Sequence, residues 1–353
     1  MRLATVSLVV PLASLLVACG AASHTGDGDP PTDAARDTAT PDVRSDVAPD
    51  GVAPDDVAGA DAAADAQPDA RADVVTDTGT VFPPIGPTGG SVDRLHFAVF
   101  GDVRPPIPDQ TSAYPTMIVT SVMDGIESGH AQFVIGTGDY MNENFCASCA
   151  TDQIALLQSA ERHYTGYVFH GMGNHECLTI TSVNCPNQNE SVALRTFKTT
   201  LLPTRVNVYY DWHVQTSSGD AHFIATDPNA WNAEQQTWLD TVLAQPARYT
   251  FVVAHEPPSA PGPGTAAIEA SIATRTGGVT LRMYGHVHRY EHPVPNGIVT
   301  GNAGAPLSSW DTYGYAVIDQ RDDDNIVVTA YAVGSPPSPI DSFVLTPDGA
   351  LTH

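Results

Sequence analysis

The sequence predicts an α/β domain over residues 93–353, and two observations lead to this fold class. From Asp93 onward, short apolar runs typical of buried strands alternate with stretches of helical periodicity. Several of these runs also end at Asp, Asn or His, and ligands bind open α/β sheets beyond the carboxyl ends of the strands. The chain of 353 residues carries a formal charge of −25, so no nucleic-acid binding is expected.

Three strands and one helix are predicted in the first half of the domain. The helix begins at Pro115, carries Ile118, Val122 and Ile126 on one face, and ends at Gly129. The strands and the turns that follow them are Leu95–Phe100 with Gly101-Asp102, Gln132–Ile135 with Gly138-Asp139, and Tyr167–Phe169 with Gly173-Asn174-His175-Glu176.

The second half continues the alternation and then changes to strands alone. Asn232 caps a helix that ends at Pro246, with Gln235 three residues after the cap. The next strands are Thr250–Val253, which ends at His255, and Thr280–Met283, which ends at Gly285-His286-Val287-His288. The last strands are expected to be antiparallel and to close a second sheet: Tyr315–Ile318, Ile326–Ala330 and Phe343–Leu345.

The polar residues at these strand ends predict a metal centre. Carboxylates, imidazoles and an amide with few thiols suit divalent metals of the Fe, Zn or Mn class. Two such ions about 3.5 to 4 Å apart need a bridging carboxylate and can clamp both oxygens of a phosphoryl displacement. Asp139 is the natural bridge, and His286 and His288 can each serve one ion, because they lie two residues apart on a loop.

The full set of motifs, in this chain order, resembles the calcineurin-like metallophosphoesterase superfamily, and most closely the purple acid phosphatases. Their GNH-D/E, V-x-x-H and G-H-x-H blocks match Gly173–Glu176, Val252–His255 and Gly285–His288. The resemblance implies a two-sheet β-sandwich flanked by helices. It also implies a metal-dependent phosphoesterase that hydrolyses a small phosphorylated substrate by direct attack of metal-bound hydroxide, with two divalent metal ions and no covalent intermediate.

The resemblance assigns a role to each matching residue. Asp102 and His288 would bind the first metal, and Asp139 would bridge the two ions. The second metal would be bound by Asn174, His255 and His286. His175 would contact the phosphoryl oxygens or protonate the leaving group.

Two positions depart from the family pattern. Arg104 stands where most of the superfamily has a histidine ligand, and Asn142 stands where purple acid phosphatases have a compensating tyrosine. The first metal is therefore expected to bind weakly. Arg104 could instead bind phosphate, because a guanidinium presents a fork of donors that matches phosphate oxygens. The alternative is an arginine that pairs with an acid such as Glu176 or Asp139 and fills the vacated position.

These departures leave more than one function open. A slight preference for phosphate monoesters follows from the resemblance and from the charge of Arg104, and a phosphodiesterase is the alternative. A third possibility is a non-catalytic surface module that binds a metal or a phosphate, because Arg104 replaces a ligand. The intact Asn174-His175 pair and the intact His286 and His288 favour an enzyme.

The amino terminus predicts export. Residues 1–18 form a short, mostly apolar signal peptide, and Leu16-Val17-Ala18-Cys19 resembles the bacterial lipobox, which implies a lipidated Cys19. An ordinary secretory signal is the alternative. Gly20 after the cysteine favours the outer membrane of a diderm bacterium, reached through the lipid anchor. Residues 20–92 hold 14 Asp, 3 Arg and neither Lys nor Glu, so residues 19–92 are expected to be a disordered linker.

Four cysteines remain after Cys19. In an exported protein an even set predicts two disulfides, and three pairings are possible. A zinc site is the less favoured alternative in an oxidising compartment. The four residues are Cys146, Cys149, Cys177 and Cys185.

Overall fold

The computed structural model describes residues 84–144, 146, 148–177, 191–308 and 311–352. The predicted signal peptide, Cys19, most of the predicted linker and Cys185 lie outside these residues. Within the described part of the chain, no helix is both long enough and apolar enough to cross a membrane.

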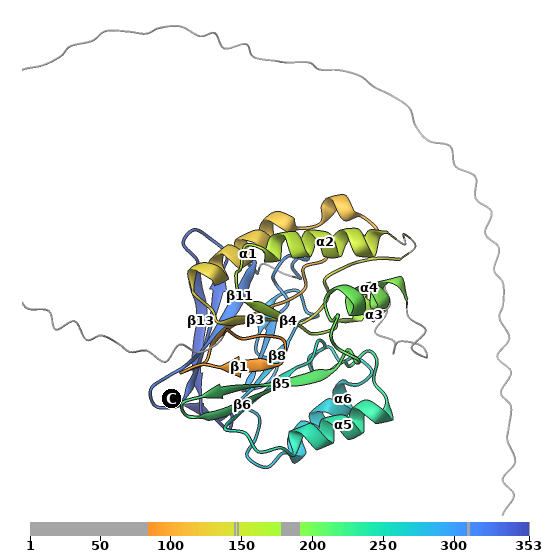
Figure 1. The fold of residues 1–353 in the computed structure, drawn as a ribbon. Helices are drawn as coiled ribbons and strands as arrows, with labels where there is room; N and C mark the ends of the chain where they lie inside the picture. The colour runs from red at the N-terminus through yellow and green to blue at the C-terminus, as the bar shows by residue number, and fades with distance from the viewer. Residues whose placement is uncertain (1–83, 145, 147, 178–190, 309–310, 353) are drawn as a thin grey trace, which may run out of the picture. The chain divides into compact units, whose positions relative to one another are not determined.

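The described strands form two seven-stranded sheets (Figure 1). In the first sheet the order is β1 (Gly89–Ser91), β5 (Tyr210–Thr216), β6 (Gly219–Ala225), β7 (Tyr249–Val253), β8 (Leu281–Tyr284), β10 (Gly297–Thr300) and β9 (Tyr290–Glu291). In the second it is β14 (Leu351–Thr352), β13 (Ser338–Leu345), β12 (Ile326–Ala332), β11 (Gly314–Gln320), β2 (His96–Phe100), β3 (Phe133–Gly136) and β4 (Tyr167–His170).

Each sheet contains a parallel core that sends its carboxyl ends in one direction. In the second sheet β2 pairs with β3 and β3 with β4, all parallel. In the first sheet β6, β7 and β8 are parallel neighbours. The carboxyl-terminal strands β11 to β14 are antiparallel, as predicted for the end of the domain.

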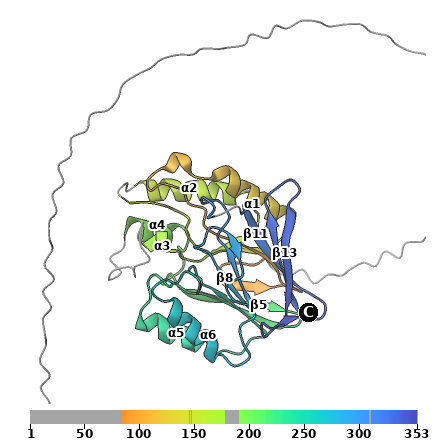
Figure 2. The same ribbon diagram turned by 180° about the vertical axis from the view of Figure 1, so that it is seen from behind.

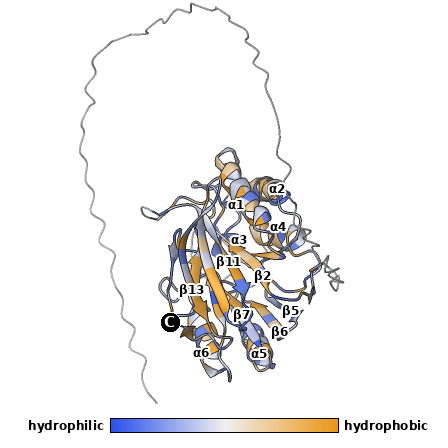
Figure 3. Ribbon diagram, turned by 90° about the vertical axis from the view of Figure 1, so that its left-hand side faces the viewer, coloured by the Kyte–Doolittle hydropathy of each residue, from blue (hydrophilic) through white to orange (hydrophobic). Residues whose placement is uncertain are grey.

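Aromatic rings from both sheets meet in the core between them. Phe97 of β2 packs edge-on against Phe223 of β6 and Phe251 of β7, with both centroid distances at 5.3 Å. Phe133 of β3 stacks on Phe97 and packs edge-on against Phe223. The strands carry the apolar colour of Figure 3, as expected for strands covered on both faces. This core fixes the two sheets against each other.

Helices cover the two outer faces (Figures 1 and 2). On one side lie α1 (Thr116–Ser128) and α2 (Cys149–Glu161), with α3 (Asn174–Cys177), α4 (Val192–Thr200) and the short 3-10 helix Thr111–Ala113 nearby. On the opposite side lie α5 (Ala233–Leu243) and α6 (Thr265–Thr274). Asn232 caps α5 by accepting from Gln235 N at 2.9 Å, as predicted. The predicted α/β sandwich flanked by helices is therefore confirmed.

The predicted boundary at residue 93 is too late. β1 pairs in parallel with β5, and Ile85 and Val92 are buried. The pairing also requires glycine at position 89, because a Cβ there would lie 1.8 Å from the carbonyl oxygen of His213. Residues 84–92 thus belong with the domain.

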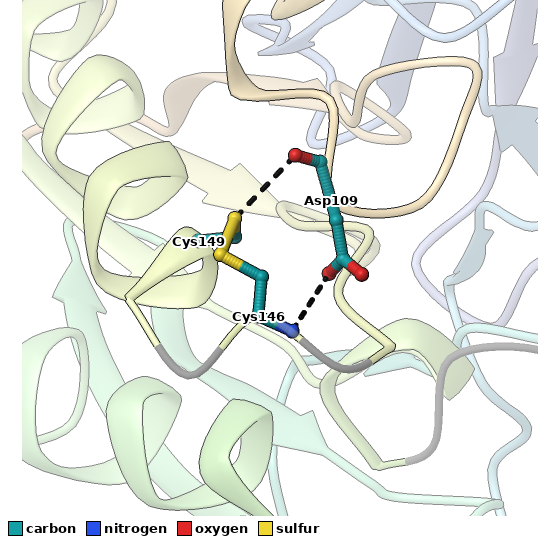
Figure 4. A group of neighbouring side chains, drawn as sticks. All are labelled: Asp109, Cys146 and Cys149. Atoms are coloured by element: carbon teal, nitrogen blue, oxygen red, sulfur yellow. Dashed lines mark hydrogen bonds between the residues drawn. A yellow bond between two sulfur atoms is a disulfide. The ribbon is translucent and has the colours of Figure 1, made fainter.

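One of the predicted disulfides is present. Cys146 and Cys149 are bonded at the start of α2 (Figure 4). Asp109 holds this loop, because its carboxylate accepts from Cys146 N at 3.4 Å and its carbonyl oxygen lies 3.4 Å from Cys149 Sγ. This pair is therefore a disulfide and not half of a zinc site. Cys177 is buried at the end of α3, and a pairing with Cys185 stays a prediction.

Candidate metal centre

The six predicted metal ligands come together at the carboxyl ends of five strands. They follow β2, β3 and β4 of one sheet and β7 and β8 of the other. Two triads form, each with ligand atoms that lie within 4.8 Å of one another. The triads are Asp139, His255 and His286, and Asp102, Asp139 and His288.

Backbone conformation aims several of these side chains. Asp102, Asp139 and His286 have φ angles of 57°, 60° and 69°, in the left-handed region that costs free energy for residues other than glycine. Hydrogen bonds between turns hold this geometry, since Asp102 N donates to Gly138 O and Val103 N donates to Asp139 O, both at 3.0 Å. Such strain at a cluster of polar side chains is typical of functional sites.

The asparagine half of the centre comprises Asn174, His255, His286 and the Oδ1 atom of Asp139. His255 Nδ1 lies 2.9 Å from the carbonyl oxygen of Thr137, so Nδ1 carries the proton in a neutral ring. Its Nε2 then faces Asn174 Oδ1 at 3.1 Å and Asp139 Oδ1 at 3.2 Å. His286 Nδ1 lies 2.9 Å from the same Asn174 oxygen.

This donor set requires a positive charge at its middle. A neutral His255 would point a lone pair at two oxygen atoms. Burial alone would lower the pKa of His255, but the charges of Asp139 and Asp102 outweigh burial and raise the pKa well above its ordinary value. A divalent cation can replace that proton, because metal binding releases protons from its ligands. Two imidazoles, a carboxylate and an amide oxygen thus fit a divalent metal ion.

The arginine half comprises Asp102, His288, Arg104 and the Oδ2 atom of Asp139. His288 Nδ1 donates to Pro306 O at 2.8 Å, so Nε2 presents its lone pair to the site. Arg104 Nη2 lies 3.3 Å from that Nε2, and Arg104 Nε lies 3.4 Å from Asp139 Oδ2. Asp102 Oδ2 accepts from His286 N at 2.9 Å, and Asp102 Oδ1 lies 3.5 Å from His288 Nε2. Here a protein cation already stands among the ligand atoms.

Glu176 positions the shared carboxylate. It accepts backbone N–H groups from Asp139 at 2.8 Å, Tyr140 at 2.7 Å and Gly173 at 2.8 Å. Burial, together with the charge of Asp139, raises the pKa of Glu176 to about 7. The sequence offered Glu176 either as a residue that orients a ligand or as a partner of Arg104; Arg104 instead pairs with Asp139, the other partner considered. The signal available was an acid inside the Gly173–Glu176 turn, at a strand end.

His175 lies beside the shared carboxylate. Its backbone N–H donates to Asp139 Oδ1 at 3.0 Å, and its Nε2 lies 3.8 Å from Asp139 Oδ2. Burial lowers the pKa of His175 to about 4, with the neighbouring cations adding to the effect and Asp139 opposing it. Among the described residues, His175 Nδ1 has no hydrogen-bond partner. That Nδ1 atom is buried, and Nε2 is the polar atom of the neutral ring on the side of Asp139, from which a substrate could be contacted.

The residues that might have replaced the missing ligand do not do so. Asn142 Nδ2 donates to Pro105 O at 3.1 Å, so this amide is bonded to the backbone next to Arg104. The ring of Tyr140 stacks on Phe197 in the core. The arginine half therefore offers three candidate ligands among the described residues, Asp102, Asp139 and His288.

Comparison with known proteins agrees with this geometry. A family model described as calcineurin-like phosphoesterase matches residues 95–290. No curated protein matches. A purple acid phosphatase from yellow lupin (Lupinus luteus) seeds has 16% sequence identity and a TM-score of 0.53, with 74% of this chain and 57% of that chain covered. A dimetal phosphatase from Danio rerio has 12% identity and a TM-score of 0.48, with 72% and 99% covered.

The likeness to the lupin enzyme shows a shared fold, and the present chain spans little more than half of that protein's length. The family match covers more than half of the present chain and includes all six candidate ligands. The chain therefore belongs to the calcineurin-like phosphoesterase family, and its two triads are candidate metal ligands.

Proposed function

We propose that this protein hydrolyses a small phosphate ester, with monoesters slightly preferred over diesters, by direct attack of hydroxide on phosphorus. The observation that carries the proposal is the asparagine half, where His255 Nε2 faces Asn174 Oδ1 and Asp139 Oδ1 at 3.1 and 3.2 Å. Asn174, His255, His286 and Asp139 would hold a divalent cation of the Zn, Mn or Fe class there, and such a cation would supply hydroxide by bringing the pKa of water to near 7.

Residues behind the candidate ligands orient the ligand side chains. Thr137 O holds the tautomer of His255, and Glu176 holds the backbone of Asp139 through its hydrogen bonds. Loss of a hydrogen-bond partner that orients a ligand typically lowers metal affinity or activity by about 10-fold to 100-fold. His255 and His286 must be neutral to bind a metal. Burial and the neighbouring cations lower the pKa of His286 to about 4, so this ring is neutral at physiological pH.

Arg104 and His175 are the residues that we assign to the substrate. Within the described residues, Arg104 makes three hydrogen bonds, to Asp139, His288 and Pro105. A guanidinium has about five N–H donors, so donors remain for phosphoryl oxygens. A fixed positive charge beside the reacting group favours the dianion of a monoester over the monoanion of a diester. The neutral His175 contacts the same oxygens; with a pKa of about 4 the ring carries no extra proton that it could donate to the leaving group at physiological pH.

The test is hydrolysis of a chromogenic phosphate monoester and of the matching diester by the full chain in detergent. Metal is first removed with a chelator and then restored with Zn²⁺, Mn²⁺ or Fe²⁺ in turn. Activity that disappears with the chelator and returns with a metal supports the proposal, and the ratio of the two rates measures the ester preference. A folded protein that binds metal and hydrolyses neither ester would contradict it and would favour a non-catalytic binding module.

We also propose that the protein is exported and anchored by a lipid on Cys19, at the outer membrane of a diderm bacterium. The support is the lipobox-like Leu16-Val17-Ala18-Cys19 and the Gly20 that follows it. Labelled palmitate should enter the wild-type chain and not a Cys19→Ser variant. Labelling that persists in the variant would remove the anchor from the proposal.

A further inference from the structure

The arginine half of the centre has no lone pair left for a metal at its histidine. His288 Nδ1 is committed to the carbonyl of Pro306 at 2.8 Å, so Nε2 is the one ring atom that could bind a cation. That atom lies 3.3 Å from Arg104 Nη2. A lone pair can accept one N–H group or bind one metal ion, and here it accepts the N–H.

The shared carboxylate divides its oxygens in the same way. Asp139 Oδ2 lies 3.4 Å from Arg104 Nε, whereas Asp139 Oδ1 lies 3.2 Å from His255 Nε2. One oxygen thus serves the guanidinium and the other serves the asparagine half. The guanidinium therefore contacts two of the three candidate ligands in the triad Asp102, Asp139 and His288.

The two halves differ in what faces their ring nitrogen. His255 Nε2 lies near two oxygen atoms, Asn174 Oδ1 at 3.1 Å and Asp139 Oδ1 at 3.2 Å, which together can hold a cation. The guanidinium of Arg104 stays protonated in proteins and offers no lone pair. Its side chain is only 15% exposed, and the backbone before Pro105 is restricted to extended conformations, which limits the directions in which it can turn away. A divalent cation among Asp102, Asp139 and His288 would also be repelled by it.

We propose that the guanidinium of Arg104 takes the place of one metal ion, so that each chain binds a single divalent cation, held in the asparagine half. This inference rests on the proposed function. The sequence predicts two ions with a weak first site, and the contacts of Arg104 give the reason for the weakness.

The experiment counts metal ions. The full chain in detergent is stripped with a chelator, dialysed against Zn²⁺ or Mn²⁺, and its bound metal is measured by mass spectrometry. We expect one tightly bound ion per chain in the wild type and two in Arg104→His, which supplies an imidazole in place of the guanidinium. Arg94→His is the matched control, because Arg94 is an exposed arginine paired with Asp322, and it should stay at one.

A second pair of variants keeps the inference falsifiable if Arg104→His does not fold. His286 and His288 are two residues apart, yet the inference places only His286 on a metal. His286→Ala should lose the tight ion, and His288→Ala should retain it. Mn²⁺ should give the electron paramagnetic resonance spectrum of an isolated ion in the wild type and of a coupled pair in Arg104→His.

Several results would overturn the inference. Two equally tight ions in the wild type, no second ion in a folded Arg104→His, or loss of half the metal in His288→Ala would each do so. The metal count is independent of hydrolysis, so one ion per chain with no activity on any ester would defeat the proposed function and leave this inference standing. A wild-type chain that binds no metal would defeat both.

Discussion

In the asparagine half, a ring nitrogen of His255 faces two oxygen atoms, whereas in the arginine half a ring nitrogen of His288 accepts an N–H from Arg104. Both histidines are oriented by a backbone carbonyl, and both lie beside Asp139. The ligand types are therefore nearly the same. The difference teaches that a set of ligand atoms needs a metal only where the protein has not already supplied a fixed cation.

The largest effect is expected from Asp139, which belongs to both halves. Asp139→Asn removes the negative charge that faces the metal position on one side and Arg104 on the other. We expect kcat to fall by about 1,000-fold or more, since metal and hydroxide are positioned by this group. Asp341→Asn is the control, because Asp341 pairs with His292 on the surface. A fall in kcat of less than about 10-fold would contradict a role of Asp139 in both halves.

Asp227, a buried acid that follows β6, should make the stability of the protein depend on pH. Burial raises the pKa of Asp227 to about 7, although the N–H groups of Ala230 and Asn229 oppose the shift. The folded state then holds a proton that the unfolded state has lost, from roughly pH 4 to pH 7. The free energy of unfolding should fall as pH rises through this window and stay level above it, by up to about 4 kcal/mol for this group.

Denaturant titrations of metal-free protein at a series of pH values test this. Asp227→Asn keeps an acceptor for the two N–H groups and removes the titration, so its stability should fall less between pH 4 and pH 7 than that of the wild type. Equal slopes for the two proteins would mean that Asp227 is ionised throughout. All other acids titrate in both proteins, so the difference between the two pH dependences reports on Asp227 alone.

Glu176 tests whether the halves share one support. In Glu176→Gln at least one of the backbone N–H groups of Asp139, Tyr140 and Gly173 loses its acceptor. We expect stability to fall by about 2 kcal/mol and metal affinity to fall by about 10-fold to 100-fold. Glu127→Gln is the exposed control, where the carboxylate accepts from Thr165 N. Unchanged metal affinity in Glu176→Gln would separate the support of Asp139 from the metal position.

The smallest effect is expected from the disulfide near the arginine half. The double variant Cys146→Ala, Cys149→Ala opens a loop of very few residues, so the stability should fall by about 2 kcal/mol or less. The metal count should not change, because the cysteines contact Asp109 and no candidate ligand in the described structure. A changed metal count would show that this loop positions the centre.

Much of this centre could be predicted because its residues sit at strand ends. Asp102, Asp139, His255 and His286 each follow an apolar run, and parallel strands bring their carboxyl ends to one edge. That local pattern needs no knowledge of distant contacts. The prediction that Asn232 caps a helix had the same basis.

Contacts between distant segments could not be predicted in this way. The bond from His288 to Pro306 joins two loops whose approach depends on the packing of both sheets. Arg104 pairs with Asp139, whereas Glu176 accepts three backbone N–H groups from two separate turns, and neither set of contacts can be read from the local sequence. The strand Gly89–Ser91 was missed because its pairing uses backbone atoms and almost no side chain.

That short strand also decides how the domain would respond to a mechanical pull. β1 lies at the edge of its sheet and joins it through the pairing of Gly89–Ser91 with β5. A pulling force applied through the preceding segment would reach the domain first at these few hydrogen bonds. The candidate metal ligands follow β2, β3, β4, β7 and β8, and none of them follows β1. Detachment of β1 under load would therefore leave the strands that carry the centre folded.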